Sequence, residues 1–149
     1  MRISLEQQVA VVTGASSGIG AGAARALAAA GAAVVVNYNS QAEPAQALAA
    51  QINQAGGRAL AIGADVSREA DVERLFAQTL DAFGHLDILV ANSGLQKDAA
   101  ISDMTLEEWN AVIGVNLTGQ FLCARAALRI FNRQGVRAGV SRAAGKIIH

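Results

Sequence analysis

TGASSGIG, residues 13–20, is the stretch that decides the fold of this chain. An apolar run at 9–12 precedes it and an Ala-rich segment follows, so the glycines stand where a strand passes into a helix. Gly14 can adopt backbone angles closed to other residues, Gly18 allows close approach of a ligand, and Gly20 allows the helix to pack on the strand. The free N–H groups and partial positive charge at the start of that helix favour a pyrophosphate in the turn.

The composition favours one close-packed α/β domain and gives no indication of a charged binding partner. Hydrophobic residues make up 52% of the 149 residues, and Lys plus Arg equal Asp plus Glu at 12 each. No net charge therefore attracts nucleic acid or an anionic membrane. The chain shows no signal peptide and no apolar run of about 20 residues, so we expect a cytoplasmic protein without a membrane partner. Cys123 is the single cysteine, and we expect it to be buried, with no disulfide and no metal site.

Strands and helices alternate along the rest of the chain. Strands are predicted at 9–12, 33–38, 59–62 and 86–91 and from 146 onward, and helices at 21–30, 43–55, 68–83 and 105–131, the last with a break near 114–116. Ser67 is the predicted N-cap of the third helix, and Thr105 with Glu108 predicts a capping box for the fourth. This order predicts a doubly wound parallel sheet, a Rossmann fold, in a single domain over residues 1–149.

Polar and small residues follow the predicted strands where a ligand would bind. Ligands of open parallel sheets lie at the carboxyl ends of the strands, near the reversal of strand order. Residues 38–40 follow the second strand, Asp65 and Val66 the third, and residues 92–94 the fourth. Ordinary structural roles remain open, because Asp65 could cap the next helix and 92–94 could form a simple turn.

The TGxxxGxG spacing resembles the cofactor motif of the short-chain dehydrogenase/reductase family, and the later strand ends fit the same family. The resemblance implies that Asp65 bonds the adenine amino group and that the Val66 backbone bonds the ring. The family's Asn-Asn-Ala-Gly motif is present as ANSG, residues 91–94, in which Ala91 lacks a side chain that usually bridges strands. The cofactor-binding residues that the resemblance implies are Gly14, Ser16, Ser17, Gly18, Ile19, Gly20, Tyr38, Asn39, Ser40, Asp65, Val66, Asn92, Ser93 and Gly94.

The end of the second strand bears on the choice of cofactor. Tyr38 stands where a carboxylate would repel a 2′-phosphate, and Asn39 stands where NADP users often carry Arg. Asn37, Asn39 and Ser40 could bond either nucleotide. We therefore expect NADP or NAD, with a slight preference for NADP.

The resemblance also implies part of a catalytic centre. Asn116 in VNLTG matches a catalytic asparagine that breaks the helix and holds a water in a proton relay; its other reading is a helix kink alone. The family's catalytic tyrosine stands four residues before a lysine, but Tyr38 is the only tyrosine and has no such lysine. We expect the chain to cover the N-terminal part of the family unit, to stop near the start of the fifth strand, and to be inactive alone.

Several activities fit this resemblance. NYNS, GQFLCARAAL and SRAAGKII look most like segments of glucose 1-dehydrogenases and next like those of 3-oxoacyl carrier-protein reductases. The expected reaction is hydride transfer between NAD(P) and a sugar or a secondary alcohol or carbonyl, in a protein that forms homodimers or tetramers. A noncatalytic nucleotide-binding module is the alternative, and a nucleotide-binding methyltransferase is a weaker one.

Overall fold

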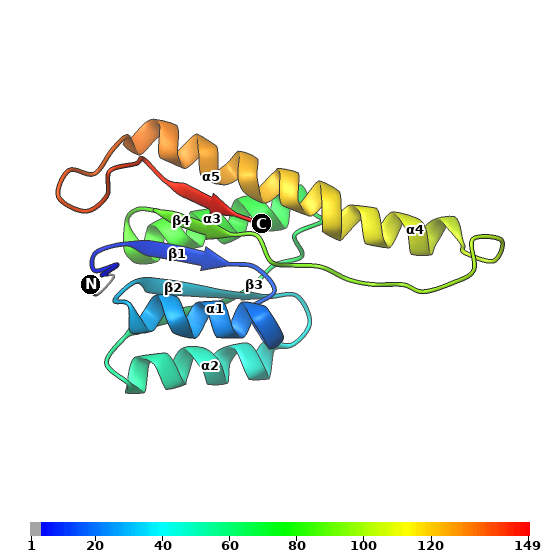
Figure 1. Cartoon of the computed structure of the whole chain (residues 1–149), viewed down its shortest axis with the longest axis horizontal. Helices are drawn as coiled ribbons and strands as arrows, with labels where there is room; N and C mark the ends of the chain where they lie inside the picture. The colour runs from blue at the N-terminus through cyan, green and yellow to red at the C-terminus, as the bar shows by residue number, and fades with distance from the viewer. Residues whose placement is uncertain (1–3) are drawn as a thin grey trace.

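The computed structural model describes residues 4–149, which form a parallel sheet flanked by helices (Figure 1). The strands are β1 (Val9–Val12), β2 (Ala33–Tyr38), β3 (Arg58–Gly63), β4 (Ile88–Val90) and β5 (Lys146–Ile148). The helices are α1 (Gly18–Ala29), α2 (Ala42–Gln54), α3 (Glu69–Phe83), α4 (Leu106–Ile113) and α5 (Gln120–Gln134), with a π-helical turn, η1 (Gly114–Gly119), joining the last two. The predicted alternation of strands and helices is confirmed.

The strand order is β3-β2-β1-β4-β5, and every pair is parallel. The chain builds outward from β1 to β3 and then crosses to the other side of β1 to add β4 and β5. Strand order thus reverses between β1 and β4, which pair in register from Ala10 opposite Ile88. The doubly wound fold that ends near a fifth strand is confirmed, and a ligand cleft is expected at this reversal.

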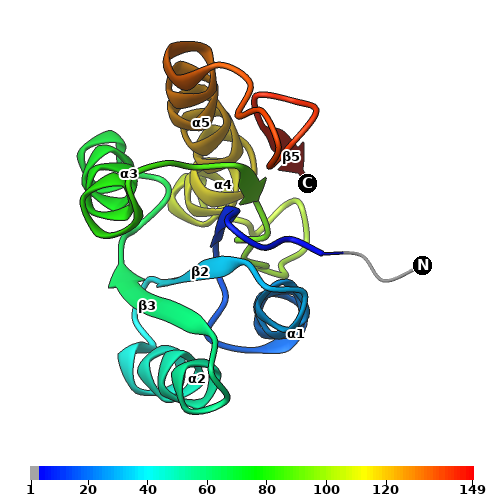
Figure 2. The same ribbon diagram turned by 90° about the vertical axis from the view of Figure 1, so that its left-hand side faces the viewer.

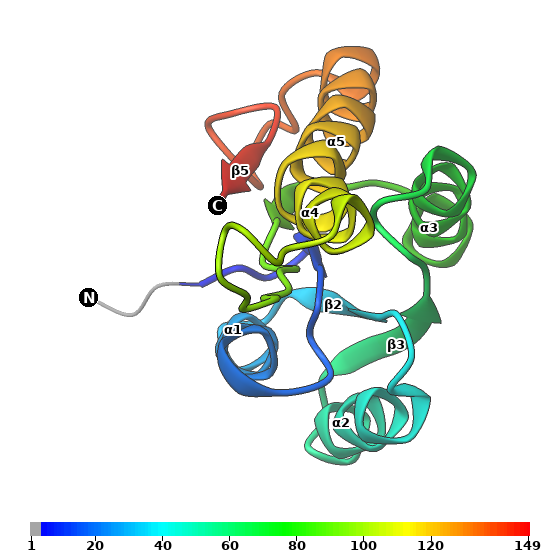
Figure 3. The same ribbon diagram turned by 90° about the vertical axis from the view of Figure 1, so that its right-hand side faces the viewer.

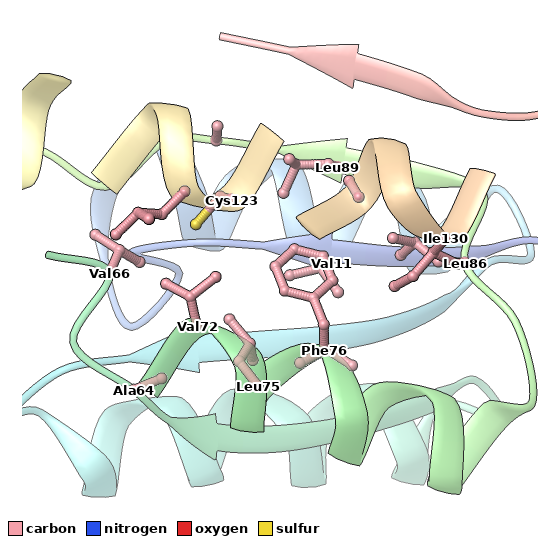
Figure 4. Close-up of a cluster of buried hydrophobic side chains, with 14 of the residues drawn as sticks. Val11, Ala64, Val66, Val72, Leu75, Phe76, Leu86, Leu89, Cys123 and Ile130 are labelled. Carbon is pink, nitrogen blue, oxygen red and sulfur yellow. The ribbon is translucent and has the colours of Figure 1, made fainter. Parts of the chain in front are cut away.

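Helices cover both faces of the sheet, so the central strands are buried on both sides. Figures 2 and 3 show α1 and α2 on one face and α3 and α5 on the other, while α4 extends past the carboxyl ends of the strands (Figure 1). Alternate residues of β2 follow this division, with Val34 and Val36 packed toward α1 and α2 and Val35 packed toward α3 and α5. Figure 4 shows the core between the sheet and the helices α3 and α5, in which Val11, Leu75, Phe76 and Ile130 meet. Continuous runs of Val and Ala in the strands are the expected sequence for such two-sided burial.

The start of α3 differs from the prediction. Arg68, and not Ser67, takes the N-cap position, and no side chain caps the helix there. Ser67 instead donates its hydroxyl to Asp65 Oδ1 at 2.7 Å, because that carboxylate is a stronger acceptor within reach. Asp71 accepts the Asp65 N–H at 3.0 Å, and hydrogen bonds from Arg74 and from that N–H hold the pKa of Asp71 below its ordinary value.

The segment from α4 to α5 is one long helix that bulges at η1. Its start has the predicted capping box, in which Thr105 Oγ1 accepts from Glu108 N at 3.1 Å and Glu108 Oε2 accepts from Thr105 N at 2.9 Å. The predicted break is the π-turn, so the helix continues in line instead of stopping (Figure 1). Over Leu106–Gln134 it is long and apolar enough, by length and composition only, to cross a membrane, although core helices of soluble proteins meet the same test.

A buried carboxylate, Asp87, fastens the connection before β5 to the amino ends of β1 and β4. Asp87 is 1% exposed, and its two oxygens each lie 2.9 Å from Arg137 Nη1. Asp87 Oδ2 also accepts from Val9 N at 2.8 Å. Both carboxylate oxygens are therefore paired, as a buried charge requires, and the connection that leads into β5 is held against β1 and β4.

Candidate functional site

A cleft lies at the carboxyl edge of the sheet, where strand order reverses. It is bounded by the turns after β1, β2, β3 and β4 and by the start of η1. Its lining residues are Gly14, Ser16, Ser17, Asn39, Ser40, Gln41, Ala64, Asp65, Val66, Ser93, Gly94, Leu95 and Val115. Most of the residues that the sequence predicts for cofactor binding therefore lie around one hollow, although they come from four separate segments.

The glycine turn leaves space and free donors on the cleft side. Gly14 and Gly18 have φ angles of +61° and +55°, which disfavour residues with a side chain. Gly20 lies so close to the β1 turn that a Cβ would meet Gly14 O at 2.4 Å. Ser17 is the N-cap of α1, yet its side chain makes no cap hydrogen bond. The serine hydroxyl and the first N–H groups of α1 are available to an anion in the turn.

Asn92 braces the cleft and does not line it. Thr13 Oγ1 accepts from Asn92 N at 2.9 Å and from Ser93 N at 3.0 Å. The Asn92 amide in turn donates from Nδ2 to Thr13 O at 3.0 Å and to Gly14 O at 3.1 Å. These bonds join the turn after β1 to the turn after β4, so the two walls of the cleft are held in a fixed relation. A direct contact of Asn92 with a cofactor stays a prediction.

The last two residues of β2, Asn37 and Tyr38, do not line the cleft, although the sequence predicted that both could contact a cofactor. Asn37 is 1% exposed, accepts from Gly14 N at 3.3 Å, and donates to the carbonyls of Ile62 and Ala64 at 3.2 and 3.1 Å. The expectation that Asn37 could bond a cofactor is therefore wrong, because its buried amide is already bonded to the backbone of the turn after β1 and of the end of β3. Tyr38 lays its ring against Gly63, where a Cβ would lie 3.1 Å from ring carbons, and it does not line the cleft.

The structure adds lining residues that sequence reasoning missed, namely Gln41, Ala64, Leu95 and Val115. Gln41 is the most chemically informative of them, since its Oε1 accepts from Ser16 Oγ at 3.2 Å. Its place directly after the NYNS segment is the sequence signal that could have identified it. Asp65 is the only ionisable side chain among the described lining residues, and its Oδ1 is already engaged by the Ser67 N–H at 2.9 Å.

Asn116 lies beside the cleft, in the π-turn. Its Oδ1 accepts from Leu95 N at 2.8 Å and its Nδ2 donates to Leu95 O at 2.9 Å. A shallow, open depression lined by Gly94, Leu95, Gln96, Lys97, Val112 and Asn116 adjoins the cleft here. The amide therefore holds the backbone of the turn after β4, and a role in proton relay stays a prediction.

An open parallel sheet with a glycine turn, an uncapped helix start and a cleft at the reversal of strand order defines a doubly wound nucleotide-binding type of protein. A family model described as short chain dehydrogenase matches residues 8–149. The chain therefore belongs to the short-chain dehydrogenase family, which confirms the resemblance seen in the sequence.

Individual relatives agree with this assignment. The 3-oxoacyl-[acyl-carrier-protein] reductase of Synechocystis sp. is 47% identical over 131 residues, which cover 88% of this chain and 53% of that protein. A short-chain dehydrogenase of Burkholderia cenocepacia, solved in complex with NADP, superimposes with a TM-score of 0.82 at 41% identity, covering 85% of this chain and 51% of that one. A short-chain type dehydrogenase/reductase of Mycobacterium marinum superimposes with a TM-score of 0.88 at 37% identity, covering 98% of this chain and 56% of that one. The chain thus spans about half the length of these relatives.

Proposed function

We propose that this chain provides the dinucleotide-binding half of an NAD(P)-dependent oxidoreductase. The observation that carries the proposal is the cleft itself, in which the glycine turn, the Asp65 and Val66 pair and the turn at Ser93 and Gly94 face one hollow. The pyrophosphate would bind Ser17 and the N–H groups at the start of α1, where the glycines leave room for it. The free oxygen of Asp65 and the backbone of Val66 would hold the adenine.

NADP, with NAD also accepted, is the cofactor that we propose. Neither Tyr38 nor Asn39 carries a carboxylate that would repel a 2′-phosphate, and the Burkholderia relative was solved with NADP. No arginine or lysine is among the described lining residues either, so the preference should be modest.

The residues of this chain hold the nucleotide, and they do not supply the proton that hydride chemistry needs. When bound, the nicotinamide would give or take the hydride, but the alcohol or carbonyl also needs an acid or base. Tyr38 packs on Gly63 and has no lysine four residues later. Asn116 fixes the Leu95 backbone beside the cleft. We therefore propose that the 149 residues bind cofactor without turning over substrate.

The substrate of the whole protein is proposed to be a sugar or another secondary alcohol or carbonyl. The sequence segments resemble glucose 1-dehydrogenases, whereas 47% identity to the Synechocystis reductase favours a 3-oxoacyl thioester as a second candidate. A cytoplasmic, homo-oligomeric enzyme fits either substrate.

Fluorescence titration with NADPH and NADH tests the proposal directly. We expect the folded wild-type chain to bind both nucleotides, and Ser17→Ala to weaken both about three- to tenfold by removing one hydrogen bond to the pyrophosphate. Gly22→Ala is the control, since a Cβ at Gly22 meets nothing within 4 Å. A folded chain that binds neither nucleotide would overturn the proposal and favour a module with another role. Turnover of glucose or a 3-oxoacyl thioester by these residues alone would overturn the proposed inactivity.

A further inference from the structure

A groove opens between α1 and α2, away from the cleft that the proposed function uses. Ser17, at the start of α1, lines the cleft, whereas the groove lies where α1 and α2 end, at the opposite edge of the sheet (Figure 1). It consists of two adjoining hollows of about 270 and 320 Å³. The hollows share the lining residues Ala28, Ala29, Ala55 and Gly57, so they form one site, the α1–α2 groove.

The inside of the α1–α2 groove is apolar. Leu48 and Ile52 form its floor, since they line it and yet are only 2% and 7% exposed. Both belong to the hydrophobic core between the sheet and these helices. Alanine and glycine line the part that the two hollows share, and their short side chains leave the space between the helix ends unfilled. The described lining residues include no aromatic ring, so a slender alkyl chain fits the groove better than a flat ring that needs a stacking partner.

One end of the groove carries a positive charge that no described residue neutralises. Arg25 lies one turn before Ala28 and Ala29 on α1, is exposed, and has no hydrogen bond or ion pair with the residues that the structure describes. The described residues that line the two hollows include no carboxylate. The Gln51 side chain, from α2, lines the same end and adds a neutral amide. A ligand that is apolar for most of its length and anionic at one end therefore complements this groove.

The other end of the groove is less suited to an anion. Arg58 lines it, but its guanidinium carbon lies 6.0 Å from the centre of the Phe83 ring, which belongs to α3 on the opposite face of the sheet. The Glu6 side chain covers Gly31 at this end, where a Cβ would lie 3.0 Å from Glu6 Cγ. Its carboxylate would repel another anion. The charged group of a ligand is therefore expected at Arg25.

We propose that the α1–α2 groove binds a straight-chain carboxylate of medium length, with its carboxylate on the Arg25 guanidinium and its alkyl chain over Leu48 and Ile52. Each methylene needs about the volume of one water molecule, about 30 Å³, so the hollow beside Arg25 accommodates roughly nine carbon atoms. The site goes beyond the proposed function, because no residue of the cleft takes part in it.

Calorimetric titration with hexanoate, octanoate and decanoate tests the site without catalysis. We expect the affinity to rise about three- to fourfold for each added methylene, since burial in the groove removes it from water. Decan-1-ol has the same chain length without the charge and should bind about three- to tenfold more weakly than decanoate. An affinity for decanoate no higher than that for hexanoate would overturn the inference, because the alkyl chain would then lie outside the groove.

Two variants with matched controls locate the ligand. Arg25→Gln should weaken decanoate binding about three- to tenfold and leave the decan-1-ol affinity within about twofold, because only the carboxylate meets the charge. Arg129→Gln removes an exposed charge from α5 and should change neither affinity. Ala29→Leu fills the groove and should weaken both ligands about tenfold or more. Ala77→Leu enlarges another exposed alanine, on α3, and should weaken neither. Circular dichroism checks that all four variants keep the wild-type fold.

The outcomes distinguish this inference from the proposed function. If Arg25→Gln and Ala29→Leu bind decanoate as tightly as the wild type does, the ligand lies elsewhere and the inference is overturned. Saturating NADPH should leave the decanoate affinity unchanged, whereas competition between the two would place the carboxylate in the cleft and overturn the inference as well. Absence of decanoate binding up to about 1 mM would have the same consequence. If decanoate binds as expected but the chain does not bind NADPH, the proposed function fails and the groove stands.

Discussion

At the scale of single residues, two glycines of α1 are expected to respond differently to replacement by alanine. Gly20 is required by its close contacts, whereas Gly22 is not. A Cβ on Gly20 would lie 2.4 Å from Gly14 O and 2.5 Å from Asn92 Nδ2, both in the braced turns, whereas Gly22 has nothing within 4 Å. We expect Gly20→Ala to lower the free energy of unfolding by about 1–3 kcal/mol through overpacking. Gly22→Ala should raise it by about 0.5–1 kcal/mol, because Ala is the better helix former. Equilibrium urea unfolding measures both, and equal stabilisation by the two variants would contradict the tight turn.

Cys123 gives a second prediction at this scale. Burial raises the pKa of its thiol to about 12, so the native protein carries almost no thiolate near neutral pH. We expect a disulfide-exchange reagent at pH 8 to label Cys123 only after urea unfolds the chain. Since the native pKa lies above the ordinary 9.0, stability from this group is complete below pH 9 and declines as the pH rises toward 12. Labelling of native and unfolded protein at one rate would show that the thiol is accessible.

Sequence alone predicted the glycines well and the hydrogen-bond partners of polar side chains poorly. A glycine motif reports a local steric need, so it can be read from spacing. Asn37 bonds carbonyls that the alignment of β2 with β3 brings to it, and the Ser67 hydroxyl donates to Asp65 because that carboxylate is a strong acceptor within reach. Such choices depend on strand register and on competing acceptors, neither of which a strand prediction contains.

At the scale of elements, the helix from α4 to α5 has a π-helical turn where the sequence predicted a break, and its contacts explain the difference. Gly119 packs against Val66, where a Cβ would lie 2.8 Å from Val66 Cγ2, and Asn116 must face Leu95. A π-turn adds a residue to the helical turn and so changes the direction of these side chains without ending the helix. The residue types signalled an irregularity, but its form depended on contacts with the turns after β3 and β4.

The capping box of α4 predicts a pH dependence. Hydrogen bonds from the Thr105 N–H and then from its hydroxyl lower the pKa of Glu108 below the ordinary 4.5. A native pKa below the unfolded one stabilises the fold above about pH 4.5, and this stabilisation is lost as the pH falls through the lowered value. Glu108→Gln keeps the acceptor without the charge, because glutamine also serves in capping boxes. We expect the difference in urea midpoint between wild type and variant to shrink on acidification, and a difference that is constant from pH 7 to pH 3 would contradict this.

The whole molecule leaves one side of its longest helix uncovered. Large apolar side chains along α4, η1 and α5 are each about half exposed or more, and their spacing matches one side of a helix. These residues are Leu106, Trp109, Leu117, Phe121 and Leu128. The sequence predicted the doubly wound sheet because alternating buried strands and helices admit few arrangements. Which helix side stays exposed follows only from how α5 seats Leu122, Ala127 and Ile130 in the core.

This exposed side leads us to expect self-association in solution. Full burial of a large apolar side chain contributes about 1.5–3 kcal/mol, so covering several half-exposed ones offsets much of the entropy of association. Sedimentation velocity at tens of micromolar should show dimers or larger species for the wild type. The double variant Leu117→Glu with Leu128→Glu should sediment as a monomer with an unchanged circular dichroism spectrum. Val136→Glu, an exposed apolar site outside this helix, should still associate. A wild-type monomer would contradict the expectation, and flotation of the wild type with lipid vesicles would assign the exposed side to a membrane instead.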